Sequence, residues 1–256
     1  MHLLSKGDSN VKLKKSSGQG YLLFGLSLLP ADASGYNVCS HSTDGCRGAC
    51  VLMFAGRSNM PSVRKARKRK TIMLFEDRAL FLADLHEDLY AAERAAERAG
   101  LVCAVRLNVA SDQLWEVIDP TLFSLHRKIE YYDYSKIPAR CTRPLPDNYA
   151  LTYSHNENTN PVWLADILAN GVNVAVVFDT LYNPSRGKVG ELPETWAFNG
   201  RSYNVIDGDT HDIRLREFDG TGNVIGLRGK GGKRIVKQGV KTGFILPTIG
   251  GVASVA

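Results

Sequence analysis

Three cysteines lie close together in the sequence, in a window that is rich in glycine. Cys39, Cys46 and Cys50 have the spacing C-x6-C-x3-C, and Gly45 and Gly48 lie between them. Glycine tolerates positive φ angles, so such a chain can fold tightly around a compact group. Three thiolates that converge from one loop are typical of an iron–sulfur cluster with one open iron, which is the first interpretation of this window.

Zinc is the alternative ligand for the same loop. His41 lies between the first two cysteines, so Cys39, His41, Cys46 and Cys50 would form a Cys3His set. All four residues belong to one segment without a second ligand pair, and this favours the cluster. Only two other cysteines occur in the chain, which favours metal binding over unconnected thiols. The spacing leaves both metals open.

Length and composition narrow the class of protein. The chain has 256 residues, which is typical of a single α/β barrel. No stretch approaches the ~20 apolar residues of a membrane span, and the first residues lack the apolar region of a signal peptide. We therefore expect a cytoplasmic protein with no membrane partner. In that reducing compartment, clustered cysteines bind metal more often than they form disulfides.

Strand-like and helix-like segments alternate between residues 21 and 178. Apolar runs predict strands at 21–29, 101–108, 129–134, 148–154 and 172–178, and helical periodicity predicts helices at 62–99, 113–128 (divided or kinked by Pro120) and 161–170. Beyond residue 179 only short strands are predicted, near 203–206, 224–227 and 244–246, and no long helix. We expect an α/β fold, namely a partial or irregular TIM-type barrel with a loop-rich C-terminal third. It would form one domain over residues 1–256, with a loose lead-in at 1–20.

Polar side chains follow the predicted strands, at the edge that is the working face of α/β barrels. We expect seven of them to line the mouth of the barrel and to hold an anionic or polar ligand: Arg106, Asn108, Ser111, Asp112, Tyr132, Lys136 and His155. The segment Asp207–Asp212 is also acidic. Its three aspartates and one histidine could bind magnesium, calcium or manganese. It lacks the longer pattern of a calcium loop, so we favour a turn over this metal site.

A basic run lies at the start of the helix predicted at 62–99. Residues 64–70 carry six positive charges, and the whole chain has a net charge of +6. The helix macrodipole disfavours cations at this end, so something should compensate them. Nucleic-acid phosphates would do so, with binding that weakens steeply as salt rises. The other interpretation is a solvated face, partly paired with Glu76, Asp77, Asp84 and Glu87.

With these residues in view, the chain resembles a bacteriophage protein family of unknown role that is distantly similar to radical S-adenosylmethionine enzymes. The resemblance covers roughly residues 21–230, and the cysteine loop is its specific part. The other features that carry it are Leu26–Pro30, Arg106–Asn108 with Ser111-Asp112 and Trp115-Glu116, Tyr132–Lys136, and Ile206–Asp209 with His211-Asp212.

The resemblance implies an α/β barrel with a 4Fe–4S cluster, or its three-iron form, on Cys39, Cys46 and Cys50. The open iron would face the barrel mouth and bind S-adenosylmethionine. A redox or radical enzyme in the cytoplasm of an infected bacterium is then the first expected function, with a small-molecule substrate or an electron donor as its partner. The second is a nucleic-acid-binding protein that uses the basic run at 64–70 and a structural zinc.

Overall fold

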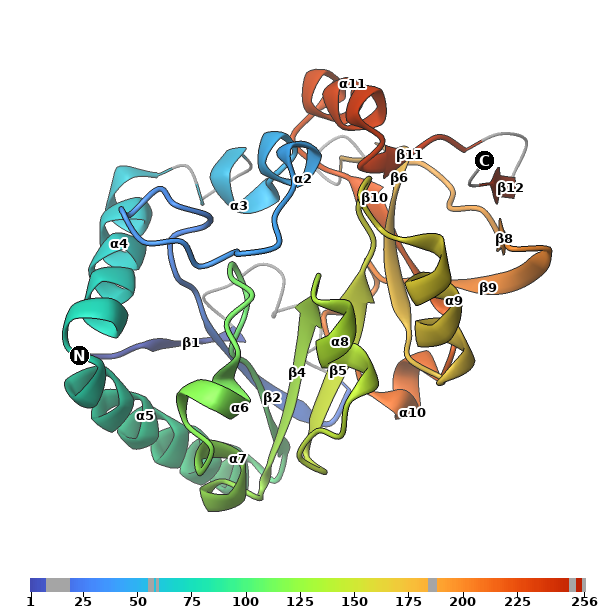
Figure 1. Ribbon diagram of the computed structural model, residues 1–256. Coiled ribbons are helices and arrows are strands. Elements are labelled where there is room, and N and C mark those ends of the chain that lie inside the picture. The colour runs from blue at the N-terminus through green and yellow to red at the C-terminus, as the bar shows by residue number, and fades with distance from the viewer. Residues whose placement is uncertain (8–18, 55–57, 59, 184–187, 249–251, 255–256) are drawn as a thin grey trace.

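A curved sheet of mostly parallel strands forms the centre of the molecule (Figure 1). The computed structural model describes residues 1–7, 19–54, 58, 60–183, 188–248 and 252–254. The strand order is β1-β2-β3-β4-β5-β6-β10-β9-β8-β12, while β7 and β11 pair with β6. The strands are β1 (Leu4–Lys6), β2 (Tyr21–Leu26), β3 (Val102–Arg106), β4 (Ile129–Ser135), β5 (Tyr149–Ser154), β6 (Val174–Asn183), β7 (Lys188–Val189), β8 (Thr195–Phe198), β9 (Arg201–Asp207), β10 (Val224–Gly229), β11 (Ile245–Leu246) and β12 (Val252–Ser254).

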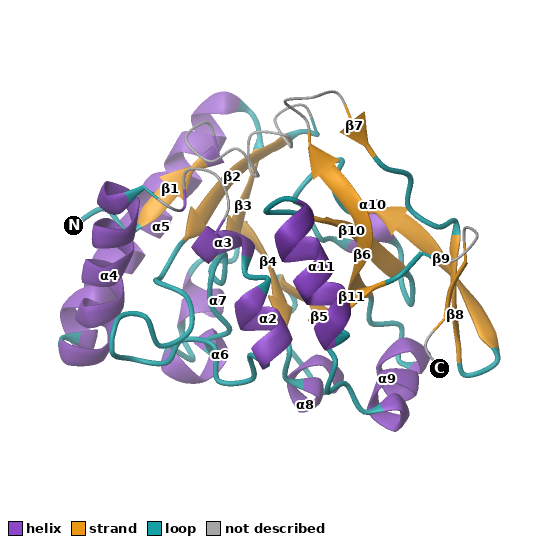
Figure 2. Ribbon diagram, turned by 90° about the horizontal axis from the view of Figure 1, so that it is seen from above, coloured by secondary structure: helices purple, strands orange, loops and turns teal. Residues whose placement is uncertain are grey.

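Helices cover the outer side of this sheet and one of its ends. Figure 2 shows α4 to α9 along the outer side, whereas α2, α3 and α11 lie over the end to which the parallel strands point. The helices are α2 (Asp44–Gly48), α3 (Val51–Phe54), α4 (Pro61–Glu76), α5 (Arg78–Ala99), α6 (Trp115–Ile118), α7 (Leu122–Leu125), α8 (Pro138–Thr142), α9 (Pro161–Ala169), α10 (Arg216–Asp219) and α11 (Lys233–Thr242). No helix in the described part of the chain is both long enough and apolar enough to span a bilayer.

The five strands predicted between residues 21 and 178 are confirmed as β2 to β6, and each pairs with the next in parallel. The long helical segment is two helices, α4 and α5, and Gly100 ends α5 in the left-handed conformation that glycine adopts without strain. Pro120 divides the next predicted helix into α6 and α7, because its ring cannot continue a helix.

The predicted TIM-type barrel is wrong, because the sheet is open. At one end β1 pairs with β2 in antiparallel fashion, and at the other β12 pairs with β8. Among the described strands these two ends do not pair with each other. After β6 the chain forms an antiparallel hairpin of β8 and β9 in place of another helix–strand unit. Asn199 and Gly200 turn this hairpin with positive φ angles of 48° and 71°.

The segment between β9 and β10 covers the inner side of the sheet, where the opposite strands of a barrel would lie. Ile213 and Leu215 pack there against Leu23, Ala104 and Tyr132 of β2, β3 and β4. All five side chains are buried. The inner side is therefore filled by this segment, which replaces the interior of the expected barrel.

The outer side of the same strands packs against α5. Phe81, Leu85 and Leu89 recur every four residues, so they lie on one face of this helix, and they are fully buried. They belong to one apolar core with Val105 and Tyr131 of β3 and β4. Successive side chains of β3 and β4 point to opposite sides of the sheet, so the outer core is separate from the inner one.

The predicted loose lead-in contains the short strand β1. Asp88 of α5 holds this start of the chain, since its carboxylate accepts the N–H groups of Leu3 at 2.5 Å and Leu4 at 2.9 Å. The remainder of the predicted lead-in, residues 8–18, lies outside the described residues.

Candidate functional site

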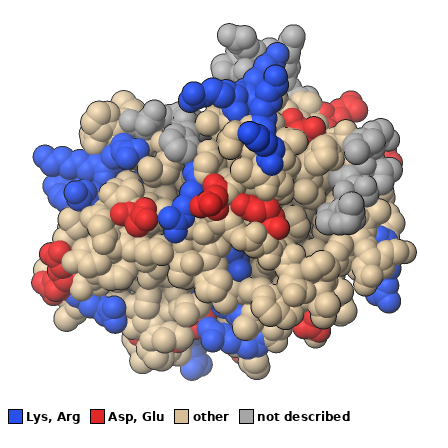
Figure 3. Space-filling model, turned by 45° about the horizontal axis from the view of Figure 1, so that its top comes forward, with Lys and Arg blue, Asp and Glu red and all other residues tan. Residues whose placement is uncertain are grey.

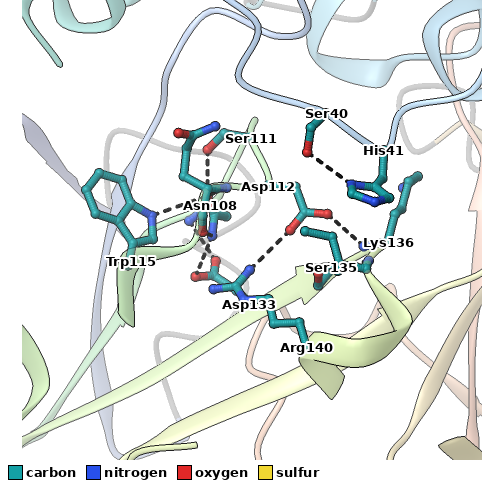
Figure 4. Close-up of polar contacts among 12 residues, drawn as sticks. Ser40, His41, Asn108, Ser111, Asp112, Trp115, Asp133, Ser135, Lys136 and Arg140 are labelled. Atoms are coloured by element: carbon teal, nitrogen blue, oxygen red, sulfur yellow. Dashed lines mark hydrogen bonds and ion pairs between the residues drawn. The ribbon is translucent and has the colours of Figure 1, made fainter. Parts of the chain in front are cut away.

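The residues predicted to hold a ligand lie at the carboxyl ends of β3, β4 and β5, but most of them bind one another. Asn108 is the clearest case (Figure 4). Its side-chain oxygen accepts hydrogen bonds from the Ser111 hydroxyl at 2.8 Å, the Gln113 amide at 2.8 Å and the Trp115 indole at 3.3 Å. Its backbone N–H donates to one Asp133 oxygen at 2.7 Å, and its side-chain Nδ2 donates to the other at 3.3 Å. Asn108 and Ser111 therefore build the loop after β3.

Arg140 of α8 binds the next acidic residues of this loop. Its guanidinium donates to Asp112 at 3.1 Å, to both Glu116 oxygens at 2.9 and 2.8 Å, and to the Tyr149 hydroxyl at 2.6 Å. The other Asp112 oxygen accepts the backbone N–H of Lys136 at 2.7 Å (Figure 4). Arg140 is 1% exposed, so its charge has to be balanced by these carboxylates. The acceptor capacity of Asp112 is thereby used within the protein.

Asp133 lies beneath this network and has an unusual protonation equilibrium. Its oxygens accept from Asn108 and from the Tyr149 hydroxyl, the latter at 3.0 Å, and the side chain is fully buried. Burial raises the pKa of Asp133 to about 7, although Arg106 and Arg140 lower it in part. Desolvation dominates because the charged form loses its water.

Arg106 and Tyr132 point to the inner side of the sheet and meet the segment that fills it. The Arg106 guanidinium donates to both oxygens of Asp212 at 3.1 and 3.2 Å and lies 4.7 Å from the centre of the Tyr134 ring. The Tyr132 hydroxyl donates to the same carboxylate at 3.4 Å. Burial is the largest single effect and disfavours the charge of Arg106, but Asp212, Tyr134, Asp133 and Tyr132 together outweigh it and raise the pKa of Arg106. These residues fix the segment to the sheet.

The acidic segment at 207–212 is held by two cations from the end of β10. Arg228 donates to Asp207 at 2.8 Å, and Lys230 donates to Asp209 at 2.5 Å. Asp207 also accepts the amide of Asp209, as in an Asx turn. The interpretation of this segment as a turn agrees with these contacts.

Lys136 differs from the other predicted ligand residues. It is half-buried, its ammonium donates to the Ser154 hydroxyl at 2.8 Å, and it lies 5.8 Å from the centre of the Phe244 ring. His155 is close enough for the Lys136 charge to lower its pKa, and burial is the larger cause of that shift, which brings the pKa of His155 to about 4. Lys136 and Ser154 thus form a small polar pair beneath the cysteine loop, whereas the ring of His155 packs against Trp196.

The three thiols of the cysteine loop have different surroundings. Cys39 Sγ lies 3.5 Å from the amide nitrogen of Ala31 and 3.6 Å from the carbonyl oxygen of Ala110. Cys46 lies in α2 and packs against the apolar side of α11, next to Phe244. His41 is exposed, and its ring lies within hydrogen-bond distance of the Ser40 hydroxyl (Figure 4).

The predicted metal-binding group is therefore wrong. Across the described ranges, no three His, Cys, Asp or Glu side chains are grouped so that they could hold a metal ion. Cys39, Cys46 and Cys50, alone or with His41, do not form such a group in the described structure, and binding of an iron–sulfur cluster or of zinc stays a prediction from the sequence. Binding of S-adenosylmethionine and redox activity stay predictions from the sequence.

Burial also determines the charge of the thiols. It raises the pKa of Cys39 to about 11 and raises the pKa of Cys50, although Lys136 lowers both in part. Both thiols are consequently protonated near neutral pH. This leaves the ammonium of Lys136 as the principal charge beneath the loop.

Cations gather on two helices that are far apart in the sequence. The residues are Arg64, Lys65, Lys68 and Arg69 of α4, and Lys233, Arg234, Lys237 and Lys241 of α11, which together we call the basic face. Their spacing places each set on one side of its helix. Figure 3 shows both sets in one view, α4 at the left and α11 at the top. Within the described part of the chain, none of the eight forms an ion pair.

Two cations of the basic run at 64–70 have a structural role. The Arg67 guanidinium donates to the Leu52 carbonyl at 3.2 Å and to the Ser58 hydroxyl at 3.4 Å. Lys70 donates to the Leu3 carbonyl. These two side chains tie α4 to neighbouring segments and are not part of the basic face.

The acids considered as partners of the run are engaged elsewhere. Glu76 accepts from the Tyr36 hydroxyl at 2.8 Å, Asp77 accepts from the Leu80 amide at 3.2 Å, and Asp84 binds the Met1 ammonium at 2.6 Å. Three of the four acids considered, Glu76, Asp77 and Asp84, therefore bind groups other than the cations of the run, while the solvated face itself stays an alternative interpretation.

Sequence reasoning did not identify Arg140, Phe244 or the cations of α11 as parts of this region. Arg140 follows Pro138 without a motif around it, so nothing in its neighbourhood indicated a buried network. The repeat of cations at 233, 237 and 241 was the available signal of a helix face.

Comparison with known proteins gives one match. A family model described as gene product 88 matches residues 2–246. Neither the curated proteins nor the solved structures contain a match to the chain.

Proposed function

We propose that this chain, which belongs to the gene product 88 family, a phage-type family of unknown function, binds nucleic acid through its basic face. The proposal places this activity in the cytoplasm of an infected bacterium. It needs no zinc, because the basic face lies on α4 and α11 and not on the cysteine loop. Radical chemistry is not part of it, since the barrel and the ligand group which that chemistry requires are the two expectations overturned above.

The observation that carries the proposal is that two separate helices, α4 and α11, present cations on one side of the molecule (Figure 3). Neither helix contains an acidic residue among its cations, because α4 has its only acid at Glu76 and α11 has none. A phosphate backbone holds condensed counterions, and protein cations that lack acidic partners release those counterions when they bind it. The net charge of +6 adds long-range attraction for a polyanion.

A salt titration with matched charge reversals tests the proposal. Binding of a fluorescein-labelled 30-base-pair duplex and of the corresponding single strand would be followed by anisotropy between 50 and 300 mM NaCl. We expect the logarithm of the association constant to fall linearly with the logarithm of salt concentration. Lys65→Glu/Lys68→Glu and Lys233→Glu/Lys237→Glu should each weaken binding at least about tenfold and make the salt slope shallower by about one for each lost contact.

The control is the double reversal Arg127→Glu/Lys128→Glu, which changes the same amount of charge near α7, at the other end of the molecule (Figure 1). It should leave the affinity within about threefold of the wild type, since only the general field changes. Equal weakening by all three double variants, or binding that is indifferent to salt, would reject the basic face as the binding surface. Arg67 is excluded from these variants because of its structural contacts.

A further inference from the structure

Lys136 and Ser154 occupy equivalent positions on neighbouring strands. In the parallel pair of β4 and β5, Ser135 is opposite Tyr153, so the next residues along each strand are Lys136 and Ser154. Side chains at one level of adjacent parallel strands point to the same side of the sheet. The 2.8 Å bond from the ammonium to the hydroxyl follows from this register.

The pair presents donors without a carboxylate to accept them. An ammonium has three N–H groups, and the bond to Ser154 uses one of them, while the hydrogen of the Ser154 hydroxyl stays available. Within the described residues Lys136 forms no ion pair. The half-buried positive charge therefore lacks a counter-charge.

The acidic side chains near Lys136 already accept hydrogen bonds from other groups. Glu157 accepts from the Thr43 hydroxyl at 2.8 Å and from the Gly45 amide at 2.7 Å, which holds the start of α2. Both oxygens of Asp112 are used by the Lys136 backbone and by Arg140. The thiols of Cys39 and Cys50 and the ring of His155 are neutral near pH 7, as their shifted pKa values require.

We propose that Lys136 and Ser154 bind one phosphate group at the carboxyl ends of β4 and β5. The ammonium and the hydroxyl would donate to two phosphate oxygens, and the Phe244 ring would border the site. The phosphate belongs either to a free ion or mononucleotide, or to the backbone of a nucleic acid. With the first source the site is independent of the basic face.

Isothermal titration calorimetry with inorganic phosphate, adenosine 5′-monophosphate and acetate at equal ionic strength tests the site. We expect phosphate and the mononucleotide to bind the wild type at least about tenfold more tightly than acetate. Lys136→Met and Ser154→Ala should each weaken phosphate binding about tenfold or more, because each removes one charge-assisted hydrogen bond. Lys136→Arg should retain binding within a few-fold, and Lys128→Met, at an exposed lysine paired with Glu97, should leave it unchanged.

Each outcome is decisive. Unchanged phosphate affinity in Lys136→Met, or acetate binding as tight as phosphate binding, overturns the site. Retained phosphate binding in Lys65→Glu/Lys68→Glu and in Lys233→Glu/Lys237→Glu supports it even where those variants lose the duplex, which separates it from the proposed function. If only the duplex is weakened by Lys136→Met and free phosphate does not bind, the backbone is the source of the phosphate. Should Lys136→Met fail to fold by near-ultraviolet circular dichroism, Ser154→Ala and Lys136→Arg carry the comparison.

Discussion

The imidazole rings of His86 and His126 share a hydrogen bond of 2.9 Å, between Nδ1 of His86 and Nε2 of His126. Nε2 of His86 in turn lies 2.7 Å from an oxygen of Asp119. An ionised Asp119 can only accept, so His86 donates to it from Nε2. Nδ1 of His126 faces Glu93 at 3.5 Å. The bond between the rings joins α5 to the end of α7 and requires that one of the two facing nitrogens carries no hydrogen.

Acid should therefore weaken the protein through His126. Burial, and the neighbouring His86, lower the pKa of His126 to about 4 from an ordinary value of 6.5. Between pH 6.5 and 4 the unfolded chain binds a proton at this ring and the folded chain does not, so the free energy of unfolding falls as pH falls. The loss from this ring is at most about 3 kcal/mol. Urea unfolding of His126→Asn and wild type across that range should give a shallower pH dependence for the variant, and identical slopes would contradict the assignment.

The network around Arg140 should make this residue costly to remove. Arg140→Met leaves Asp112 and Glu116 without their buried counter-charge, and we expect the free energy of unfolding to fall by about 3–5 kcal/mol. Arg143 also binds Glu116 but is 42% exposed. Arg143→Met should therefore cost less than about 1 kcal/mol. Chemical denaturation of both variants measures the difference, and equal losses would show that burial is not the cause.

Two glycines of α2 should respond in opposite ways to alanine. A Cβ at Gly45 would lie 2.5 Å from a Glu157 oxygen and 2.7 Å from Cβ of Phe244, so Gly45→Ala should force α2 away from α11 and destabilise the protein by about 1–3 kcal/mol. A Cβ at Gly48 would meet nothing within 4 Å. Gly48→Ala should stabilise by about 0.4–1 kcal/mol, because it restricts the unfolded chain. Thermal melts of the pair test the close approach of the two helices, and a harmless Gly45→Ala would argue against it.

The thiol of Cys39 should react slowly. Because burial raises the pKa of Cys39 from 9.0 to about 11, its thiolate fraction at pH 8 is about a hundredfold lower than that of an ordinary cysteine. Alkylation by iodoacetamide, followed by mass spectrometry of the Cys39 peptide, should lag behind N-acetylcysteine by at least that factor. Lys136→Met should slow it further, since the ammonium lowers this pKa. Rapid modification of Cys39 in the folded protein would contradict the burial.

Local patterns predicted the first two thirds of the fold well. The apolar run at 172–178 identified β6, and the helical periodicity at 62–99 identified the segment that forms α4 and α5. The course of the chain after β6 depended on packing between distant segments. Nothing in the sequence of Ile213 and Leu215 indicated that they would fill the inner side of the sheet in place of further strands.

In the candidate site, too, the contacts between distant segments could not be predicted from the sequence. The spacing of Cys39, Cys46 and Cys50 indicated that three sulfurs were near one another along the chain, but not where each would point. One helical turn in α2 directs Cys46 to α11, while Cys39 packs between Ala31 and Ala110. Polarity at the strand ends was predicted correctly. Which of those side chains bind one another was decided by Arg140, a residue with no local signature.

The buried guanidinium between α6 and α8 has a consequence for the history of the family. Replacing Arg140 alone leaves two buried acids without a counter-charge, and replacing Asp112 or Glu116 alone leaves the buried guanidinium partly unpaired. Replacing all three residues by apolar ones need cost little stability. Relatives should therefore carry either the full trio or none of it. The residues at positions 112, 116 and 140 should therefore vary together among relatives, and sequences that keep only one or two of the three should be rare.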